Sequence, residues 1–329
     1  MTVMWRQQAI TLAILLLAFA LWCGRLNGPS FWIDEQVAAE IAGESDLKSV
    51  WQGVAHRERR PPGYHLLLFT WRHAAGDTDF ALRYPSAAAG VLALAVTTRL
   101  ARHWVGRRAA SGCGILTACS AFLALYVPMA RYYSLVWLLA ASSWLALERW
   151  LVRRWPWGVY AAITLALMYT DPAIIPVLIG QGIRLYAGKQ GQRRAWALTV
   201  LALGLAMLPW WHILPRQVSR DLLRADLSGT AAGILLRLST PWYVWTVGEA
   251  TLPWRGIAWL GLLAGGLLIM AAIKRPRPRA VLALGVLVPL GFTIGLTEIV
   301  TPDITFLNTA SRALYAAPAL YLVWSAGLK

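Results

Sequence analysis

The chain alternates between long apolar runs and short charged segments. A bilayer-spanning helix needs about 20 apolar residues, and fewer where neighbouring helices or a thinner bilayer compensate. The pattern therefore predicts an all-α integral membrane protein with about ten transmembrane helices. The runs lie at residues 9–24, 85–100, 109–127, 134–150, 157–170, 172–187, 195–211, 255–273, 280–297 and 311–327.

The apolar stretch over residues 157–187 is interrupted by Asp171-Pro172. Basic residues flank it on both sides, and such residues concentrate on the cytoplasmic side of a membrane. Both ends of the stretch are therefore expected on one side. This predicts a hairpin of two short helices with Asp171 at its far turn.

The first run follows Arg6, as the apolar core of a signal peptide would. No small-x-small cleavage site follows it, however, and the bulky Trp22 before Cys23 does not fit a lipoprotein signal. We therefore expect a retained signal anchor.

The composition excludes an ordinary soluble domain. Of the 329 residues, 58% are hydrophobic and 14% are charged, and the mean hydropathy is +0.53. Many of the 19 tryptophans, Trp22 and Trp210 among them, lie where an apolar run meets polar sequence. This placement predicts aromatic belts at the membrane interfaces.

The formal charge of +16 follows from topology. Cytoplasmic placement is expected for both termini and for the basic clusters at residues 99–108, 149–154, 184–194 and 274–279. This accounts for the charge without a nucleic-acid partner. The chain is then one polytopic domain over residues 1–329, with two long outer loops. The first, residues 25–84, carries interfacial helices, and the second covers residues 212–254.

Asp34 and Glu35 follow Trp32 shortly after the first run. One interpretation is that Asp34 caps an interfacial helix. The other is that it acts at the membrane surface as a general base or as a metal ligand. Adjacent helical residues point about 100° apart, so only one of the two acids is expected to face a given site.

A dense basic cluster, HRERRPP, occupies residues 56–62 of the first outer loop. Its arginines either pair with lipid headgroups in a solvated loop or form a phosphate clamp. Arg59 and Arg60 suit a clamp because the guanidinium fork matches phosphate oxygens and the Pro-Pro step stiffens the chain.

Further candidate side chains map to the same outer face, whereas charges in the middle of the expected helices are almost absent. That distribution counts against an ion pathway, which needs buried ionisable groups. It favours chemistry at the outer interface. The candidates are Tyr64, His65, Arg83, Arg131, Tyr132, Arg312 and Tyr315.

Several familiar sites are missing from the sequence. There is no Walker A loop, no G-x-S-x-G and no H-E-x-x-H motif, and the five histidines form no zinc pattern. A divalent cation held by Asp34 with Glu35 or Asp171 remains the metal alternative.

The order of these motifs resembles the GT-C membrane glycosyltransferases. The likeness is to the protein mannosyltransferase and aminoarabinose transferase branch, of the RgtA/B/C/D-like bacterial type. It covers nearly the whole chain and is strongest over residues 31–150. The segments that carry it are WIDE, RRPPGYHLLLFTW, FALRYPSAAAGVLAL, MARYYSL and RALYAAPALYLVWSAGL.

The resemblance implies an inverting glycosyltransferase of the bacterial cell membrane, with its active site on the periplasmic or outer side. Its donor is a polyprenyl-phosphate sugar, and its acceptor is a glycan, a lipid-linked glycan or a protein. Carried over, Asp34 is the base, with Glu35 supporting it. Arg60, before Pro-Pro, grips the donor phosphate. The turn after Arg131 lacks the acid that some members carry, which counts against a two-carboxylate metal site.

Two other functions use the same arginines. A flippase or transporter of a lipid-linked sugar needs a route across the bilayer and often shows inverted repeats, and the sequence shows neither. A non-catalytic binder of such lipids needs the arginines but not Asp34.

Overall fold

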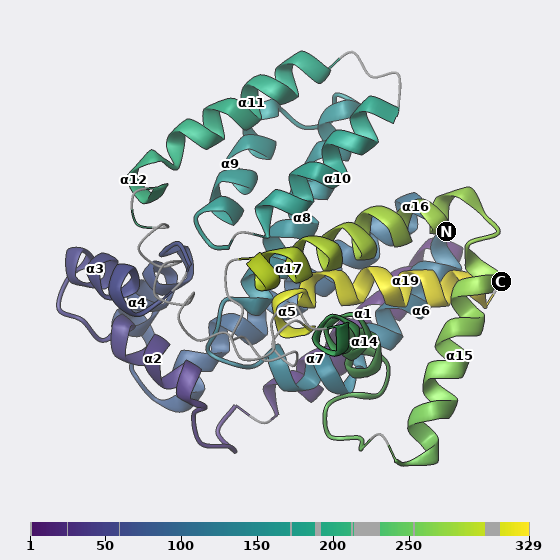
Figure 1. The fold of residues 1–329 in the computed structure, drawn as a ribbon, viewed down its shortest axis with the longest axis horizontal. Coiled ribbons are helices and arrows are strands. Elements are labelled where there is room, and N and C mark those ends of the chain that lie inside the picture. Colours follow the sequence, from purple (N-terminus) through teal and green to yellow (C-terminus); the bar gives the residue numbers. More distant parts are fainter. Residues whose placement is uncertain are drawn as a thin grey trace.

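The protein is all-helical in the part of the chain that its computed structural model describes (Figure 1). That part comprises residues 2–24, 26–58, 60–171, 173–187, 192–211, 213, 231–252, 254–299 and 310–328. No strand occurs among these residues, as the apolar pattern predicts.

A central bundle forms around two long helices, α5 (Asp79–Trp104) and α8 (Tyr133–Leu151), which pack against each other. Helix α1 (Thr2–Cys23) and helix α6 (Arg107–Ala118) lie against α5, and α19 (Ala317–Gly327) lies against α6. The other elements from residue 121 onward are α7 (Ala121–Tyr126), α9 (Trp157–Met168), α10 (Ile174–Ala187), α11 (Arg193–Ala206), α12 (Leu208–Trp211), α14 (Ala231–Val247), α15 (Gly256–Ala272), α16 (Pro276–Leu282), η1 (Ala283–Leu287), α17 (Val288–Ile299) and η2 (Leu314–Ala316).

The segment expected as the first outer loop contains three short helices, α2 (Ile33–Ala42), α3 (Leu47–Arg57) and α4 (Gly63–Ala75). They gather at one side of the molecule, and the two chain ends lie on the other side (Figure 1). At the start of α3, Asp46 accepts a hydrogen bond of 2.9 Å from the Ser49 N–H. Helix α4 begins directly after Pro61-Pro62, as expected where prolines fix the backbone.

Three stretches of helix are long and apolar enough to cross a membrane, namely Trp5–Cys23, Asp79–Trp104 and Pro276–Gly295. Three shorter apolar helices are Trp157–Met168, Ile174–Ala187 and Gly256–Ala272. The expected number of about ten spans therefore stays a prediction.

Two of the expected apolar runs are broken into shorter helices. The run at 109–127 divides into α6 and α7, because Ser120 accepts a hydrogen bond of 3.3 Å from the Leu123 N–H and starts a new helix. The stretch at 157–187 forms α9 and α10, with Asp171 in the turn between them. The expected break at Asp171-Pro172 is thus confirmed.

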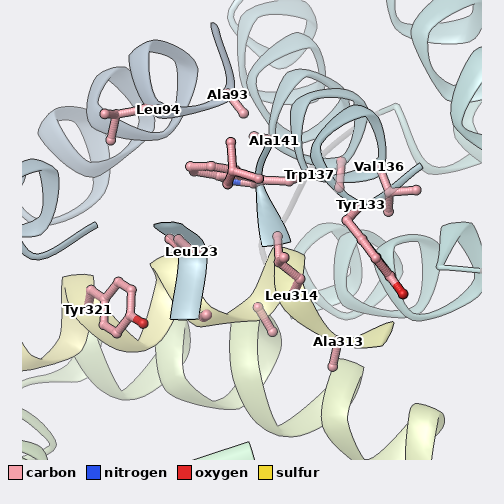
Figure 2. Close-up of a cluster of buried hydrophobic side chains, with 14 of the residues drawn as sticks. Ala93, Leu94, Leu123, Tyr133, Val136, Trp137, Ala141, Ala313, Leu314 and Tyr321 are labelled. Carbon is pink, nitrogen blue, oxygen red and sulfur yellow. The ribbon is translucent and has the colours of Figure 1, made fainter. Parts of the chain in front are cut away.

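The main hydrophobic core joins α5, α8 and the C-terminal elements. Trp137 is fully buried among residues such as Leu123, Leu314 and Tyr321 (Figure 2). Trp22 belongs to the same core and meets the Trp137 ring edge-on, with the ring centroids 6.2 Å apart.

Two of the tryptophans that were expected at the membrane interfaces are buried within the protein. Trp22 and Trp210 are 0% exposed. Trp210 packs edge-on against Trp51, with a centroid distance of 5.1 Å. Both side chains are buried against other parts of the protein, because an indole suits a packed core as well as an interface.

Helix α4 docks onto the turn between α9 and α10 through its first residue. The Gly63 N–H donates to the Tyr169 carbonyl at 2.7 Å. A Cβ at Gly63 would lie only 2.6 Å from that carbonyl oxygen. The absence of a side chain at Gly63 therefore allows the Pro-Pro segment to lie against the α9–α10 turn.

We expect Gly63→Ala to lower the stability of the protein by about 1–3 kcal/mol, because the added methyl group overlaps a backbone oxygen that cannot rotate away. Thermal unfolding in detergent measures the loss. The matched control is Gly158→Ala in α9, where a Cβ would have no neighbour within 4 Å. Equal melting temperatures for the two variants would refute the close contact.

Candidate functional site

The candidate site lies where α4, the α9–α10 turn and the start of α8 meet. Arg60 donates a hydrogen bond from Nε to Asp171 Oδ2. The other oxygen of Asp171 accepts from the Ala173 N–H at 2.7 Å, which fixes the carboxylate in its turn. The Arg60 guanidinium carbon lies 3.9 Å from the centre of the Tyr132 ring. The docking of Gly63 thus places an arginine of the basic cluster between an acid and an aromatic ring.

Arg131 is the second buried cation of the site. Its Nη1 atom donates to Glu58 and to the backbone carbonyl of Asp34, the latter at 3.0 Å. Its guanidinium carbon lies 5.2 Å from the centre of the Tyr132 ring. Arg131 therefore joins the end of α3 to the start of α2 beside the ring that Arg60 also faces.

Glu58 is the acid that holds Arg131. Burial alone would raise its pKa, but His65 and Arg131 outweigh burial and keep the pKa well below the ordinary value. His65 Nε2 lies 3.5 Å from Glu58 Oε1. Glu58 therefore stays ionised at neutral pH.

Arg312 is the third cation, and it comes from the C-terminal part of the chain. Its guanidinium group interacts electrostatically with Arg60, Tyr132 and Asp171. Three arginines therefore gather here, an arrangement that suits an anion. Tyr315, one helical turn beyond, has a buried hydroxyl with no hydrogen-bond partner among the described residues.

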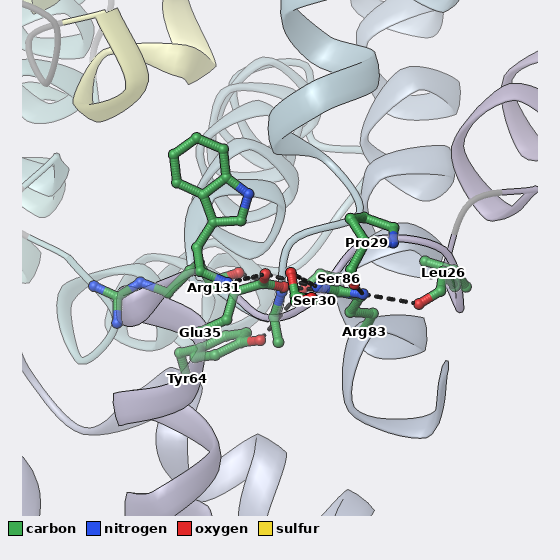
Figure 3. Close-up of polar contacts among 10 residues, drawn as sticks. Leu26, Pro29, Ser30, Glu35, Tyr64, Arg83, Ser86 and Arg131 are labelled. Atoms are coloured by element: carbon green, nitrogen blue, oxygen red, sulfur yellow. Dashed lines mark hydrogen bonds and ion pairs between the residues drawn. The ribbon is translucent and has the colours of Figure 1, made fainter. Parts of the chain in front are cut away.

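Glu35 and Arg83 form a separate, saturated ion pair behind this cluster. Arg83 donates to both carboxylate oxygens of Glu35, at 2.8 and 2.9 Å. Its remaining donors go to backbone carbonyls, including that of Leu26 at 3.0 Å and that of Pro29 at 2.8 Å (Figure 3). Glu35 also accepts from the Ala130 N–H at 2.8 Å. With their hydrogen-bonding atoms used in this way, both side chains are expected to hold the site in shape rather than to touch a ligand.

Asp34, the neighbour of Glu35, points in a different direction. Its side chain is exposed, whereas Glu35 is 1% exposed. The two carboxylates diverge because successive residues on α2 point about 100° apart, as the sequence predicts. Arg131 fixes the Asp34 backbone, and no partner for the Asp34 carboxylate is present among the described residues. Of the two acids, Asp34 is therefore the one available for chemistry.

The other wall candidates are buried at the back of the site. The Tyr64 hydroxyl lies 3.0 Å from Ser86 Oγ, which donates to the Arg131 carbonyl at 3.1 Å (Figure 3). His65 is 1% exposed beside Glu58. Both support the segment that carries Arg131. Arg59 lies outside the described residues.

The metal alternative finds limited support in the described part of the chain. No group of three or more His, Cys, Asp and Glu side chains gathers there. Both oxygens of Asp171 have protein partners, so a cation at Asp171 would have to displace Arg60 or the Ala173 N–H. Of the three predicted metal ligands, Asp34, Glu35 and Asp171, only Asp34 has an exposed side chain.

Sequence reasoning assigned no role to Glu58 and Tyr133. Glu58 is the single acid of the basic cluster at residues 56–62. A lone acid among arginines could have indicated an ion pair with one of the site's cations. The Tyr133 ring lies 4.5 Å from the Tyr132 ring and so extends the aromatic surface.

The two neighbouring acids of α2 should respond differently to the loss of charge. Glu35→Gln leaves Arg83 buried without its anion, and breaking a buried pair costs about 3–5 kcal/mol. Asp34→Asn changes an exposed side chain and should shift stability by less than about 0.5 kcal/mol. Thermal unfolding of the two variants in detergent checks the contrast. A stable Glu35→Gln protein would mean that the pair is not needed for folding.

No family model matches the sequence, and no curated protein matches it. The fold, however, is similar to that of ArnT from Cupriavidus metallidurans. The likeness to the apo structure has a TM-score of 0.65 at 16% identity and covers 96% of this chain and 59% of that chain. The structure bound to undecaprenyl phosphate gives a TM-score of 0.64 at 15% identity with the same coverage. A weaker likeness, with a TM-score of 0.46 at 14% identity, links the chain to the oligosaccharyltransferase AglB from Archaeoglobus fulgidus.

The chain thus spans 59% of the length of the ArnT structures that it matches. At this level of identity the likeness concerns the fold alone. The resemblance to GT-C membrane glycosyltransferases, expected from the sequence motifs, is confirmed at that level. The chain has a helical architecture similar to that of ArnT, and three of its helical stretches are long and apolar enough to cross a membrane.

Proposed function

We propose that the protein is an inverting glycosyltransferase that moves a sugar from a polyprenyl-phosphate donor to an acceptor hydroxyl. One observation carries the proposal. Arg60, Arg131 and Arg312 gather around Tyr132 at the position where Arg131 also fixes Asp34. A cluster of cations beside an exposed carboxylate suits the transfer of a group that leaves as a phosphate.

The cations of the site suit a lipid-linked phosphate. Asp171 pairs with Arg60, Glu58 pairs with Arg131, and Arg312 is the third cation of the cluster. A sugar phosphodiester carries one negative charge. A second develops on the phosphate as the bond to the sugar breaks, and fixed guanidinium groups stabilise developing charge of this kind.

Asp34 is the base in this proposal. The acceptor oxygen attacks the anomeric carbon and its proton passes to the Asp34 carboxylate. The bond between that carbon and the phosphate oxygen breaks on the opposite face, and its electron pair leaves with the polyprenyl phosphate. A single displacement of this kind inverts the anomeric centre. Glu35 and Arg83 take no part in bond making and hold the start of α2 in place.

The fold shared with ArnT supports the proposal, since one of the two ArnT structures is bound to undecaprenyl phosphate. We infer a multi-pass protein of a bacterial cell membrane, with its site on the periplasmic or outer face and both termini in the cytoplasm. Acceptors that suit such a face are a glycan, a lipid-linked glycan or a protein. A divalent cation at Asp34 remains the alternative to metal-free catalysis.

Mass spectrometry of lipids from a host lacking the gene tests the reaction. A polyprenyl-phosphate sugar should accumulate in that host, and the wild-type gene should remove it. Asp34→Asn should leave it in place while the folded protein still binds undecaprenyl phosphate. Arg60→Ala should lose both transfer and binding.

The matched control is Glu40→Gln, which removes an exposed carboxylate from the same helix, where Glu40 pairs at 3.5 Å with Arg57. This variant should behave as wild type. Clearance of the donor by Asp34→Asn would exclude Asp34 as the base and favour a flippase or a binding protein.

Arg312 is expected to contribute to donor binding through its guanidinium group, which interacts with Arg60 and Tyr132 in the cluster. An arginine keeps its positive charge in proteins, so this contribution should not depend on pH.

Calorimetric titration of undecaprenyl phosphate into the purified protein at neutral pH measures this contribution. Arg312→Gln should bind at least about tenfold more weakly, since a charge-assisted hydrogen bond contributes about 1.5–3 kcal/mol. Equal affinity in Arg312→Gln and wild type would exclude Arg312 from the donor site.

A further inference from the structure

The proposed reaction does not use an apolar cavity of about 430 Å³ within the helical bundle. It lies between α5, α8, α10, the α16–α17 segment and α19. Its walls consist mainly of large hydrophobic side chains and alanines, including Trp104, Trp137, Trp144, Val177, Leu284 and Leu322. Polar side chains occur chiefly at its two ends.

The cavity runs along the helices rather than across them. Tyr315 and Pro289 line it near the candidate site, and His103, Arg184 and Arg277 line it at the opposite end. From Arg277 to Pro289 the helical segment rises about 18 Å, at 1.5 Å per residue. This length is close to the apolar depth of one leaflet, about half of a 30 Å hydrocarbon core. The cavity therefore has the length and the chemistry of a site for one acyl chain.

The end of the cavity far from the candidate site is built around a buried acid. Glu148 is 6% exposed and accepts a hydrogen bond of 3.4 Å from Trp104 Nε1. Arg184 Nε lies 3.3 Å from Glu148, and His103 Nε2 lies 3.7 Å from it. Glu148 thus holds Arg184 and His103 at the mouth and neutralises one positive charge.

Arg277 adds an unpaired positive charge at the same end of the cavity. It lines the cavity, its side chain is exposed, and no acid pairs with it among the described residues. Positive charge at this end of the cavity favours an anionic headgroup over a zwitterionic one, because a basic residue beside a membrane attracts anionic lipids.

We propose that this cavity binds an anionic phospholipid, with one acyl chain between α8 and the α16–α17 segment and the phosphate against Arg277 and Arg184. The site lies at the opposite end of the helices from the arginine cluster around Tyr132. It does not rest on the proposed transferase reaction. The lipid fills an interior that would otherwise present unpacked apolar walls, and voids of that kind reduce stability.

Native mass spectrometry of the delipidated protein, with phosphatidylglycerol and phosphatidylcholine of identical acyl chains, tests the proposal. Phosphatidylglycerol, which is anionic, should bind more tightly than phosphatidylcholine, which is zwitterionic. Arg277→Gln should weaken this binding about fivefold, the effect of one basic residue near a lipid surface. Arg279→Gln removes the same charge two residues further along, from a side chain that does not line the cavity, and should leave binding nearly unchanged. Equal binding of the two lipids, or equal loss in both variants, would overturn the proposal.

Photo-crosslinking locates the chain without any substitution. Phosphatidylglycerol with a diazirine on one acyl chain should label wild-type protein at cavity residues such as Trp144 and Leu284. Undecaprenyl phosphate in excess should not reduce this labelling. Labelling confined to the outer surfaces of the helices would overturn the proposal. So would displacement by undecaprenyl phosphate, which would assign the cavity to the polyprenyl chain instead.

Discussion

The buried ion pair between Glu35 and Arg83 is the interaction on which the geometry of the site depends. Taking two charges out of water is costly unless each finds a close partner and further hydrogen bonds. Here both conditions are met, because Arg83 donates a hydrogen bond to each carboxylate oxygen of Glu35 and the Ala130 N–H donates a further one. The pair thereby joins α2, α5 and the segment before α8. Those are the elements that set the positions of Asp34 and Arg131.

The arginines around Tyr132 are also held in fixed positions. Each of two arginines has its own acid, which fixes the direction of its guanidinium group. The aromatic ring gives both a flat apolar face, and weakly hydrated guanidinium groups favour such faces. The cations are therefore ordered before a ligand arrives, so less entropy is lost when an anion binds.

The sequence predicted the helical class and the break at Asp171, because a charge next to proline within an apolar run is incompatible with a continuous helix. It also indicated Arg60 and Asp34 through their spacing from the Pro-Pro step and from Trp32. Apart from the family resemblance, the residues left open which of Asp34 and Glu35 faces the site, since the direction of α2 relative to α5 depends on contacts 48 residues away. The role of Glu58 was missed for the same reason, because its partner Arg131 is 73 positions distant.

The arginines of the site come from widely separated parts of the chain, at positions 60, 131 and 312. Until the segment that carries Arg312 packs against the first two, the cluster has two arginines instead of three. Its full positive charge is thus a property of the folded chain, because no short stretch of the sequence contains all three cations.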